Sequence, residues 1–354
     1  MEGGDGVKKK WGAAFQLAAV YVGTVVGAGF ATGKEIVEFF SRFGFIGLIG
    51  ILMSGYIFIF LGSKLMRLAA RMGAKSYQEL NTFLFGPYLG GAINILMLFM
   101  LLGVSAVMLS GAGAVFQEQL GLSRSLGIIL TIALSFIVMI VGTKGLFAVN
   151  TFVVPMMICF SFLLFIVTIQ QPNFLEQLLF IPPAEDGWKS VVNPFSYTAF
   201  NLGLAQAVLV PVAAEIKDED TVKWGGIIGG AALTVILLSS HATLIMLPNL
   251  EIYEIPMAAI MKNLAYGFHW IYVLIIYGEI FTSVIGNVYG LEKQLNNYLK
   301  LPSIVWVCII FIISYIGSFV NYGTLLSYLY PIFGYVTIIF IVLLWMKPLD
   351  SVRK

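Results

Sequence analysis

A narrow polar stripe crosses the apolar stretch IYGEIFTSVIGNVYG at residues 276–290. The residues that share one helical face are Glu279, Thr282, Ser283, Gly286 and Gly290. A polar stripe inside an apolar helix of membrane length faces protein or water rather than lipid. Two adjacent hydroxyls are hard oxygen ligands, so this face is suited to a small cation that is released in each cycle. The alternative is that Thr282 and Ser283 bond back to carbonyls of their own helix.

The first apolar stretch of the chain carries four glycines, where residues 21–36 read YVGTVVGAGFATGKEI. Glycine costs a helix interior roughly 1 kcal/mol relative to alanine. In lipid, every backbone group freed by a break needs a partner. The pattern therefore predicts a break near Gly27–Gly29 that faces protein, water or a ligand. The alternative is close helix packing through the Gly23–Gly27 spacing.

Such a break offers backbone groups of both signs. The half-helix that starts near Gly29–Thr32 presents free amides, which suit a carboxylate. The preceding half ends near Gly23–Val26 and presents free carbonyls, which suit a cation. The residues of this stretch expected to contact a solute are Gly27, Ala28, Gly29 and Phe30. Lys34, Glu35 and Glu38 follow, and are expected in a vestibule at the outer end of the span.

Glu279 is a carboxylate inside a membrane-length helix. A charged group there costs about 2.5–3.5 kcal/mol or more, so it should be partnered or protonated. It would add charge to a cation site, bind the ammonium of a solute, carry a proton, or make a structural hydrogen bond.

The sixth apolar stretch contributes candidates for solute recognition. We expect a second break near Asn201–Gly203, with Tyr197 one turn earlier and Phe200 as a lid over the pocket. The alternative is a kink caused by Pro211 and Gly203 alone. Ser105 of the third stretch is a further candidate pocket residue.

The whole chain reads as one integral membrane domain, residues 1–354. It is 59% hydrophobic and 11% charged, with a mean hydropathy of +0.94. A soluble protein of this size cannot hide that much apolar surface. We count ten apolar stretches able to cross a membrane, at 11–43, 44–69, 87–118, 124–142, 146–169, 189–216, 222–247, 256–290, 302–320 and 324–346. The longest link, 170–188, is expected to be an exposed loop with a short surface helix.

The ten stretches divide into two sets of five. The first and sixth are glycine-broken, the third and eighth are unusually long, and the fifth and tenth carry Pro155 and Pro331. Five spans place the second set upside down, which is typical of an inverted-repeat transporter with its site at the breaks. We therefore expect residues 11–169 and 189–346 to be two related five-helix repeats.

The distribution of positive charge predicts the orientation. Of the 20 Lys and Arg residues, five fall in loops on the side away from the termini, which leaves 15 on the side of the termini. The positive-inside rule then predicts cytoplasmic N- and C-termini in the cell (inner) membrane. The first stretch has no small-residue cleavage site after it, so we expect a retained span rather than a signal peptide.

Cys159 and Cys308 lie in apolar stretches and are expected to be buried free thiols.

The motifs GTVVGAGF (23–30) and FTS (281–283) resemble the sodium site of LeuT-fold transporters. This resemblance implies one sodium ion held by the carbonyls of Gly23 and Val26 and the hydroxyls of Thr282 and Ser283. Phe30 stands where relatives with a second sodium site carry an amide. AAEIKDED (213–220) resembles the end of the sixth span in the amino acid–polyamine–organocation superfamily, and VGAGFATGKEI is similar to the YkvI family of membrane proteins.

These observations predict an all-α secondary transporter with ten spans in a 5+5 inverted repeat. The expected cargo is a small amino acid or related zwitterion, carried in symport with sodium, and no cofactor is expected. The alternatives are proton coupling through Glu279, or a ligand sensor of the germinant-receptor type built on the same fold. Enzyme motifs, a nucleotide-binding loop and nucleic-acid-binding tracts are lacking in the sequence. The partners expected are the solute and the bilayer, and the oligomeric state is open.

Overall fold

The computed structural model describes residues 3–141, 143–183, 187–216, 218–264 and 266–351, and over these ranges it is helical without strands. The longer helices are α1 (Gly3–Val25), α4 (Phe45–Ile57), α5 (Ser63–Met72), α6 (Tyr77–Ala114), α7 (Arg124–Val141), α8 (Thr143–Thr168), α10 (Lys189–Glu215), α11 (Glu219–Leu244), α13 (His269–Tyr298), α14 (Ser303–Gly317) and α15 (Tyr322–Met346). The shorter helices are α2 (Ala28–Ala31), α3 (Lys34–Phe39), α9 (Phe174–Leu179) and α12 (Pro256–Leu264). Two π turns, η2 (Phe58–Gly62) and η3 (Val115–Gln119), continue α4 and α6. The 3-10 turns are η1 (Ser41–Phe43), η4 (Leu250–Ile252), η5 (Tyr266–Phe268) and η6 (Leu349–Ser351).

Six helical stretches of the described residues are long and apolar enough to cross a membrane. They are Phe45–Met72, Tyr77–Gln119, Lys189–Glu215, Glu219–Leu244, Tyr266–Asn296 and Tyr322–Met346. Three shorter apolar helices are Arg124–Met139, Pro155–Thr168 and Ser303–Gly317. The prediction of an all-α, multi-pass membrane protein is confirmed. The count of ten spans and the relation between the two sets of five stay predictions.

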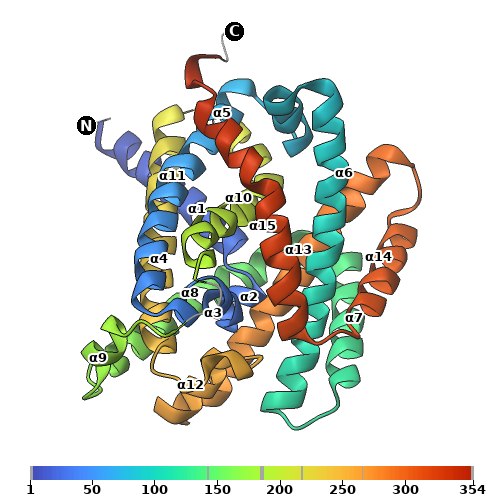
Figure 1. The fold of residues 1–354 in the computed structure, drawn as a ribbon. Coiled ribbons are helices and arrows are strands. Elements are labelled where there is room, and N and C mark those ends of the chain that lie inside the picture. Colours follow the sequence, from blue (N-terminus) through green and yellow to red (C-terminus); the bar gives the residue numbers. More distant parts are fainter. Residues whose placement is uncertain (1–2, 142, 184–186, 217, 265, 352–354) are drawn as a thin grey trace.

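The arrangement of the helices places the start of α1 and the end of α15 at the same end of the molecule, as Figure 1 shows. The short helices α9 and α12 lie at the opposite end, and α10 passes through the middle. We call these the terminal end and the distal end. The loop predicted at 170–188 contains the surface helix α9, and the Phe45 amide donates to the Phe180 carbonyl at 3.0 Å, which ties the loop to α4.

The predicted break in the sixth span is wrong, because α10 runs without interruption from Lys189 to Glu215. The side-chain amide of Asn201 donates to the Tyr197 carbonyl of its own helix at 3.1 Å, so it adds a bond to the helix. Gly203 permits close packing instead, since a Cβ there would lie 3.3 Å from Thr337 of α15. A small residue in a membrane helix therefore marked a contact with a neighbouring helix rather than an interruption.

The prediction of one long eighth span over 256–290 is also wrong. Residues 256–264 form the separate helix α12, and α13 begins at His269 and continues to Tyr298. The start of α12 contacts the link between α2 and α3, where the Met257 amide donates to the Thr32 carbonyl at 2.9 Å. The helix α12 is apolar because one of its faces is buried in the protein. It therefore has the composition of a membrane span, although it is not one.

The two cysteines are free, as predicted, but Cys159 and Cys308 are exposed rather than buried. Their helices, α8 and α14, also expose large apolar side chains such as Phe162 and Ile312. Such a surface in a membrane protein faces lipid, where a thiol behaves as a small apolar group.

Glycines on α11 let this helix approach the chain between α4 and α5 at backbone distance. A Cβ on Gly230 would lie 2.7 Å from the Cα atom of Ile59. We expect Gly230→Ala to lower the free energy of unfolding by about 1–3 kcal/mol through overpacking. Gly91→Ala in α6 is the matched control, since a Cβ there meets no atom within 4 Å. Thermal unfolding in detergent measures both, and equal stability of the two variants would contradict the packing described.

Candidate functional site

The first span breaks at Val26 and Gly27, which confirms a break near the predicted glycines. α1 ends at Val25, Gly27 is extended (φ −115°, ψ −169°), and α2 begins at Ala28. Helical hydrogen bonding resumes where the Ala31 amide donates to the Gly27 carbonyl at 2.9 Å. Among the described residues, no backbone amide donates to the carbonyls of Gly23 and Val26 across the break. Val26 is buried and Gly23 is partly buried, so the interruption leaves these backbone acceptors inside the helical bundle.

The polar stripe of α13 lies against this break. A Cβ on Gly27 would be 3.5 Å from the Ser283 Oγ atom, so that hydroxyl faces the unwound residues. The Thr282 hydroxyl donates to the Glu279 carbonyl at 3.1 Å, which is the back-bonding alternative, although its lone pairs stay available. The two groups of oxygen atoms proposed for a cation therefore come from adjacent elements, and the cation site itself stays a prediction.

Glu279 is a buried carboxylate on the same stripe, with a side chain only 1% exposed. Its Oε1 atom has no hydrogen-bond partner among the described residues. About two turns earlier on α13, the Tyr272 hydroxyl donates to the Ala31 carbonyl at 3.3 Å, which fixes this face of α13 against α2. A carboxylate in such surroundings is stable when it is protonated or paired with a cation.

Glu35 is a second buried carboxylate beside the break, and sequence reasoning missed it. Lys34 and Glu35 do not line a vestibule, because both side chains are buried, 7% and 3% exposed. The Glu35 Oε1 atom accepts a hydrogen bond from the Asn201 side chain at 3.2 Å. A Cβ on Gly29 would collide with Glu35 Oε2, so the carboxylate lies directly over that glycine. Its neighbours Lys34 and Glu38 gave the segment the appearance of a solvated helix end.

Aromatic side chains surround this region, including three of the residues predicted to contact the solute. The Tyr197 ring lies 4.9 Å from Phe40 in an edge-on arrangement, and the Phe200 ring lies 4.4 Å from Tyr330. Phe30 of α2 is buried as well. Ser105 is buried on α6, where its hydroxyl donates to the Leu101 carbonyl at 2.8 Å. This hydroxyl can therefore only accept a further hydrogen bond.

The distal side of the break is covered by the segment 249–257, which is fastened by charged groups. The Lys34 ammonium donates to the Glu251 carbonyl at 2.6 Å. The Glu118 carboxylate accepts from two successive amides of the segment at 3.1 and 3.2 Å. Arg124 pairs with Glu254 at 3.3 Å. These contacts close the site toward the distal end.

The terminal side of the stripe is open by comparison. A Cβ on Gly286 or on Gly290 would meet no atom within 4 Å. Both glycines follow Ser283 toward the end of α13 that lies nearer the termini. The structure is therefore closed on one side of the break and has free space along α13 on the other.

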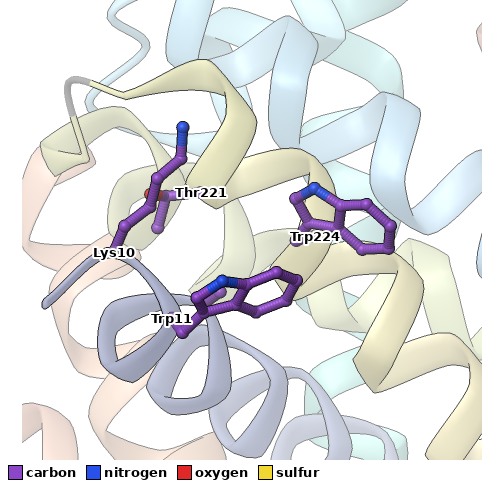
Figure 2. Close-up of a pocket in the computed structure, with 5 residues that line it drawn as sticks. Lys10, Trp11, Thr221 and Trp224 are labelled. Atoms are coloured by element: carbon purple, nitrogen blue, oxygen red, sulfur yellow. The ribbon is translucent and has the colours of Figure 1, made fainter. Parts of the chain in front are cut away.

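A surface hollow of about 200 Å³ lies at the terminal end, between α1 and α11, away from the break. Figure 2 shows Trp11 and Trp224 on its walls, and their ring centroids are 5.4 Å apart. Lys10 pairs with Asp218 at 3.2 Å, and the Thr221 hydrogen bond together with this pair lowers the pKa of Asp218. Tryptophans beside charged residues are typical of the membrane–water boundary.

The interrupted first helix, packed in an all-helical membrane domain against a polar stripe, is the architecture of a membrane transporter. The chain belongs to the spore germination protein family, whose model matches residues 13–324. It is 52% identical to the membrane protein YkvI of Bacillus subtilis (strain 168), over 93% of this chain and 94% of the relative. It is also 23% identical to the protein YyaD of the same organism, over 97% of this chain and 99% of the relative. The resemblance to the YkvI family is therefore confirmed.

The fold is similar to that of solved manganese transporter structures from Eremococcus coleocola. The complex with an aromatic bis-isothiourea substituted compound has a TM-score of 0.63 at 14% identity, covering 98% of this chain and 81% of that chain. A mutant of the same transporter, in which an alanine replaces a histidine, gives a TM-score of 0.61 with the same identity and coverage. At this identity the similarity concerns the fold. Family and fold together indicate a transporter-like membrane protein and not an enzyme.

Proposed function

We propose that the chain is a secondary active transporter that moves a small amino acid or related zwitterion together with sodium by alternating access. The observation that carries this proposal is the break of the first span, whose free backbone groups face the Ser283 hydroxyl. The sodium ligands in this proposal are the carbonyls of Gly23 and Val26 and the hydroxyls of Thr282 and Ser283. The amides near Gly29 receive the carboxylate of the solute. The terminal end is the cytoplasmic side, in line with its excess of Lys and Arg.

Proton coupling is the second candidate mechanism, and one observation favours it. Glu279 is buried on the stripe with an unpartnered carboxylate oxygen among the residues that the structure describes. A proton on this group would remove the cost of a buried charge, so its uptake and release would accompany opening toward water.

A ligand sensor is the second candidate function, favoured by the spore germination family. A sensor would bind the same solute without moving it across the membrane. The similar solved structures are described as manganese transporters. We do not propose manganese as the cargo of this chain. The described residues contain no group of three His, Cys, Asp or Glu side chains able to hold a metal ion.

A thermal-shift screen of the purified protein tests the proposal. We expect one or more small amino acids to raise the melting temperature, and to do so more in sodium than in choline. A ligand at 100 times its Kd stabilises the folded state by about 2.7 kcal/mol. Uptake into proteoliposomes then separates transport from sensing. If no amino acid stabilises the protein in either salt, the proposed solute class is wrong.

A further inference from the structure

Glu35 has no cationic partner among the described residues, in contrast to other acids of this chain. Glu38 pairs with Arg42, Glu219 with Arg67, and Glu254 with Arg124. The adjacent Lys34 is turned away, since its ammonium donates to the carbonyls of Glu251 and Tyr253. The carboxylate of Glu35 is therefore a buried acid to which the described part of the chain supplies no positive charge.

The position of this carboxylate is set from two sides. Asn201 holds it through the 3.2 Å hydrogen bond to Oε1, and the same amide donates to the Tyr197 carbonyl at 3.1 Å. The Oε2 atom lies over Gly29, where a Cβ would collide with it. The carboxylate is thus held beside the backbone of α2, next to the place that the proposed function gives to the carboxylate of the solute.

The surroundings of Glu35 suit a cation. The Tyr197 hydroxyl is buried beside the carboxylate and interacts with it. Tyr322 and Tyr330 are buried near the same carboxylate. A buried carboxylate among aromatic rings is an environment in which an ammonium group is stabilised by charge and by the ring faces.

We propose that Glu35 binds the ammonium group of the transported solute, with Asn201 as the positioning residue. This inference rests on the proposed function, which places the carboxylate of the solute at the amides near Gly29. Glu35 lies over that same glycine, so the ammonium and carboxylate of the solute must be close together. An α-amino acid, which carries both groups on one carbon, fits this requirement. The site then disfavours the matching α-hydroxy acid, which has no ammonium.

The test compares amino acids with hydroxy acids of the same shape in the purified full-length protein. The probes are glycine, alanine, serine and valine, each paired with its α-hydroxy acid, and binding is measured by thermal shift and calorimetry in sodium. We expect Glu35→Gln to weaken amino acid binding by about 30-fold or more. Binding of the hydroxy acids should be unchanged or stronger, because a negative charge near their carboxylate is removed.

Glu292→Gln is the matched control. Glu292 is also buried in a membrane helix, at the terminal end of α13, where it accepts a hydrogen bond from Ser303 at 2.6 Å. The Glu292→Gln variant should leave the preference for amino acids over hydroxy acids unchanged. The Glu35→Asp variant keeps the negative charge, so it should keep the preference for amino acids over hydroxy acids while binding them more weakly. It is the variant to measure if Glu35→Gln does not fold.

Two results would overturn the inference while sparing the proposed function. One is amino acid binding that is unaffected by Glu35→Gln. The other is an equal loss for amino and hydroxy acids, which would mean that Glu35 supports the fold of the site only. If no probe binds the wild-type protein, the proposed function fails, and the inference fails with it.

Discussion

Replacement of sodium by choline at fixed pH is expected to reduce solute uptake by proteoliposomes to background. The proposed sodium ligands come from two elements, the carbonyls of Gly23 and Val26 at the break and the hydroxyls of Thr282 and Ser283 on α13. A bound ion would hold these elements together, and a solute beside α2 would favour the same arrangement. Each ligand should therefore strengthen the binding of the other by the same factor, on the order of 1–3 kcal/mol.

The double variant Thr282→Ala, Ser283→Ala should remove this mutual effect while solute binding without sodium persists. The measurement is solute affinity with and without sodium in wild type and variant. Neutral oxygen ligands make this loss specific, because no charge is removed from the site. An unchanged response to sodium in the variant would show that these hydroxyls are not ligands.

The rival mechanism gives a different pattern in the same vesicles. If Glu279 couples transport to protons, uptake follows pH, ignores sodium and is lost in Glu279→Gln. The choline experiment decides between the two mechanisms, since a rate that is insensitive to sodium removes the sodium assignment. Glu279 would then be the coupling residue.

Gly29→Val is expected to abolish transport. In the structure a Cβ at this position collides with Glu35 Oε2 and lies 3.2 Å from Leu326 of α15. The larger side chain would displace the Glu35 carboxylate and fill the space beside the α2 amides. Radiolabelled uptake and thermal unfolding, measured on the same preparation, separate loss of the site from loss of the fold.

Gly91→Val is the control for this experiment, because a Cβ there meets no atom within 4 Å and the residue lies on α6, in a different element from the break. This variant should reach the membrane and should retain uptake. Uptake by Gly29→Val at the wild-type rate would rule out solute binding beside this glycine.

The glycines of the first and sixth stretches show where sequence reasoning succeeded and where it failed. Around Gly27, glycine coincided with a real interruption, since Gly27 is extended and helical hydrogen bonding resumes only at the Ala31 amide. Around Gly203, the helix continued, because the glycine serves a contact with Thr337 of α15. The first stretch carries four glycines between Tyr21 and Ile36, whereas the sixth carries one, Gly203, whose role is set by the neighbouring helix.

The membrane class, the break in the first helix and the polar face of α13 could be predicted from the sequence, because composition and helical periodicity are local properties of the chain. The burial of Glu35 over Gly29, the contact of α12 with the link after α2, and the free space along the stripe of α13 became visible only in the folded chain. The burial of a charged residue depends on which distant elements cover it. Asn201 and Glu35, 166 positions apart, become neighbours only when α10 packs beside α3.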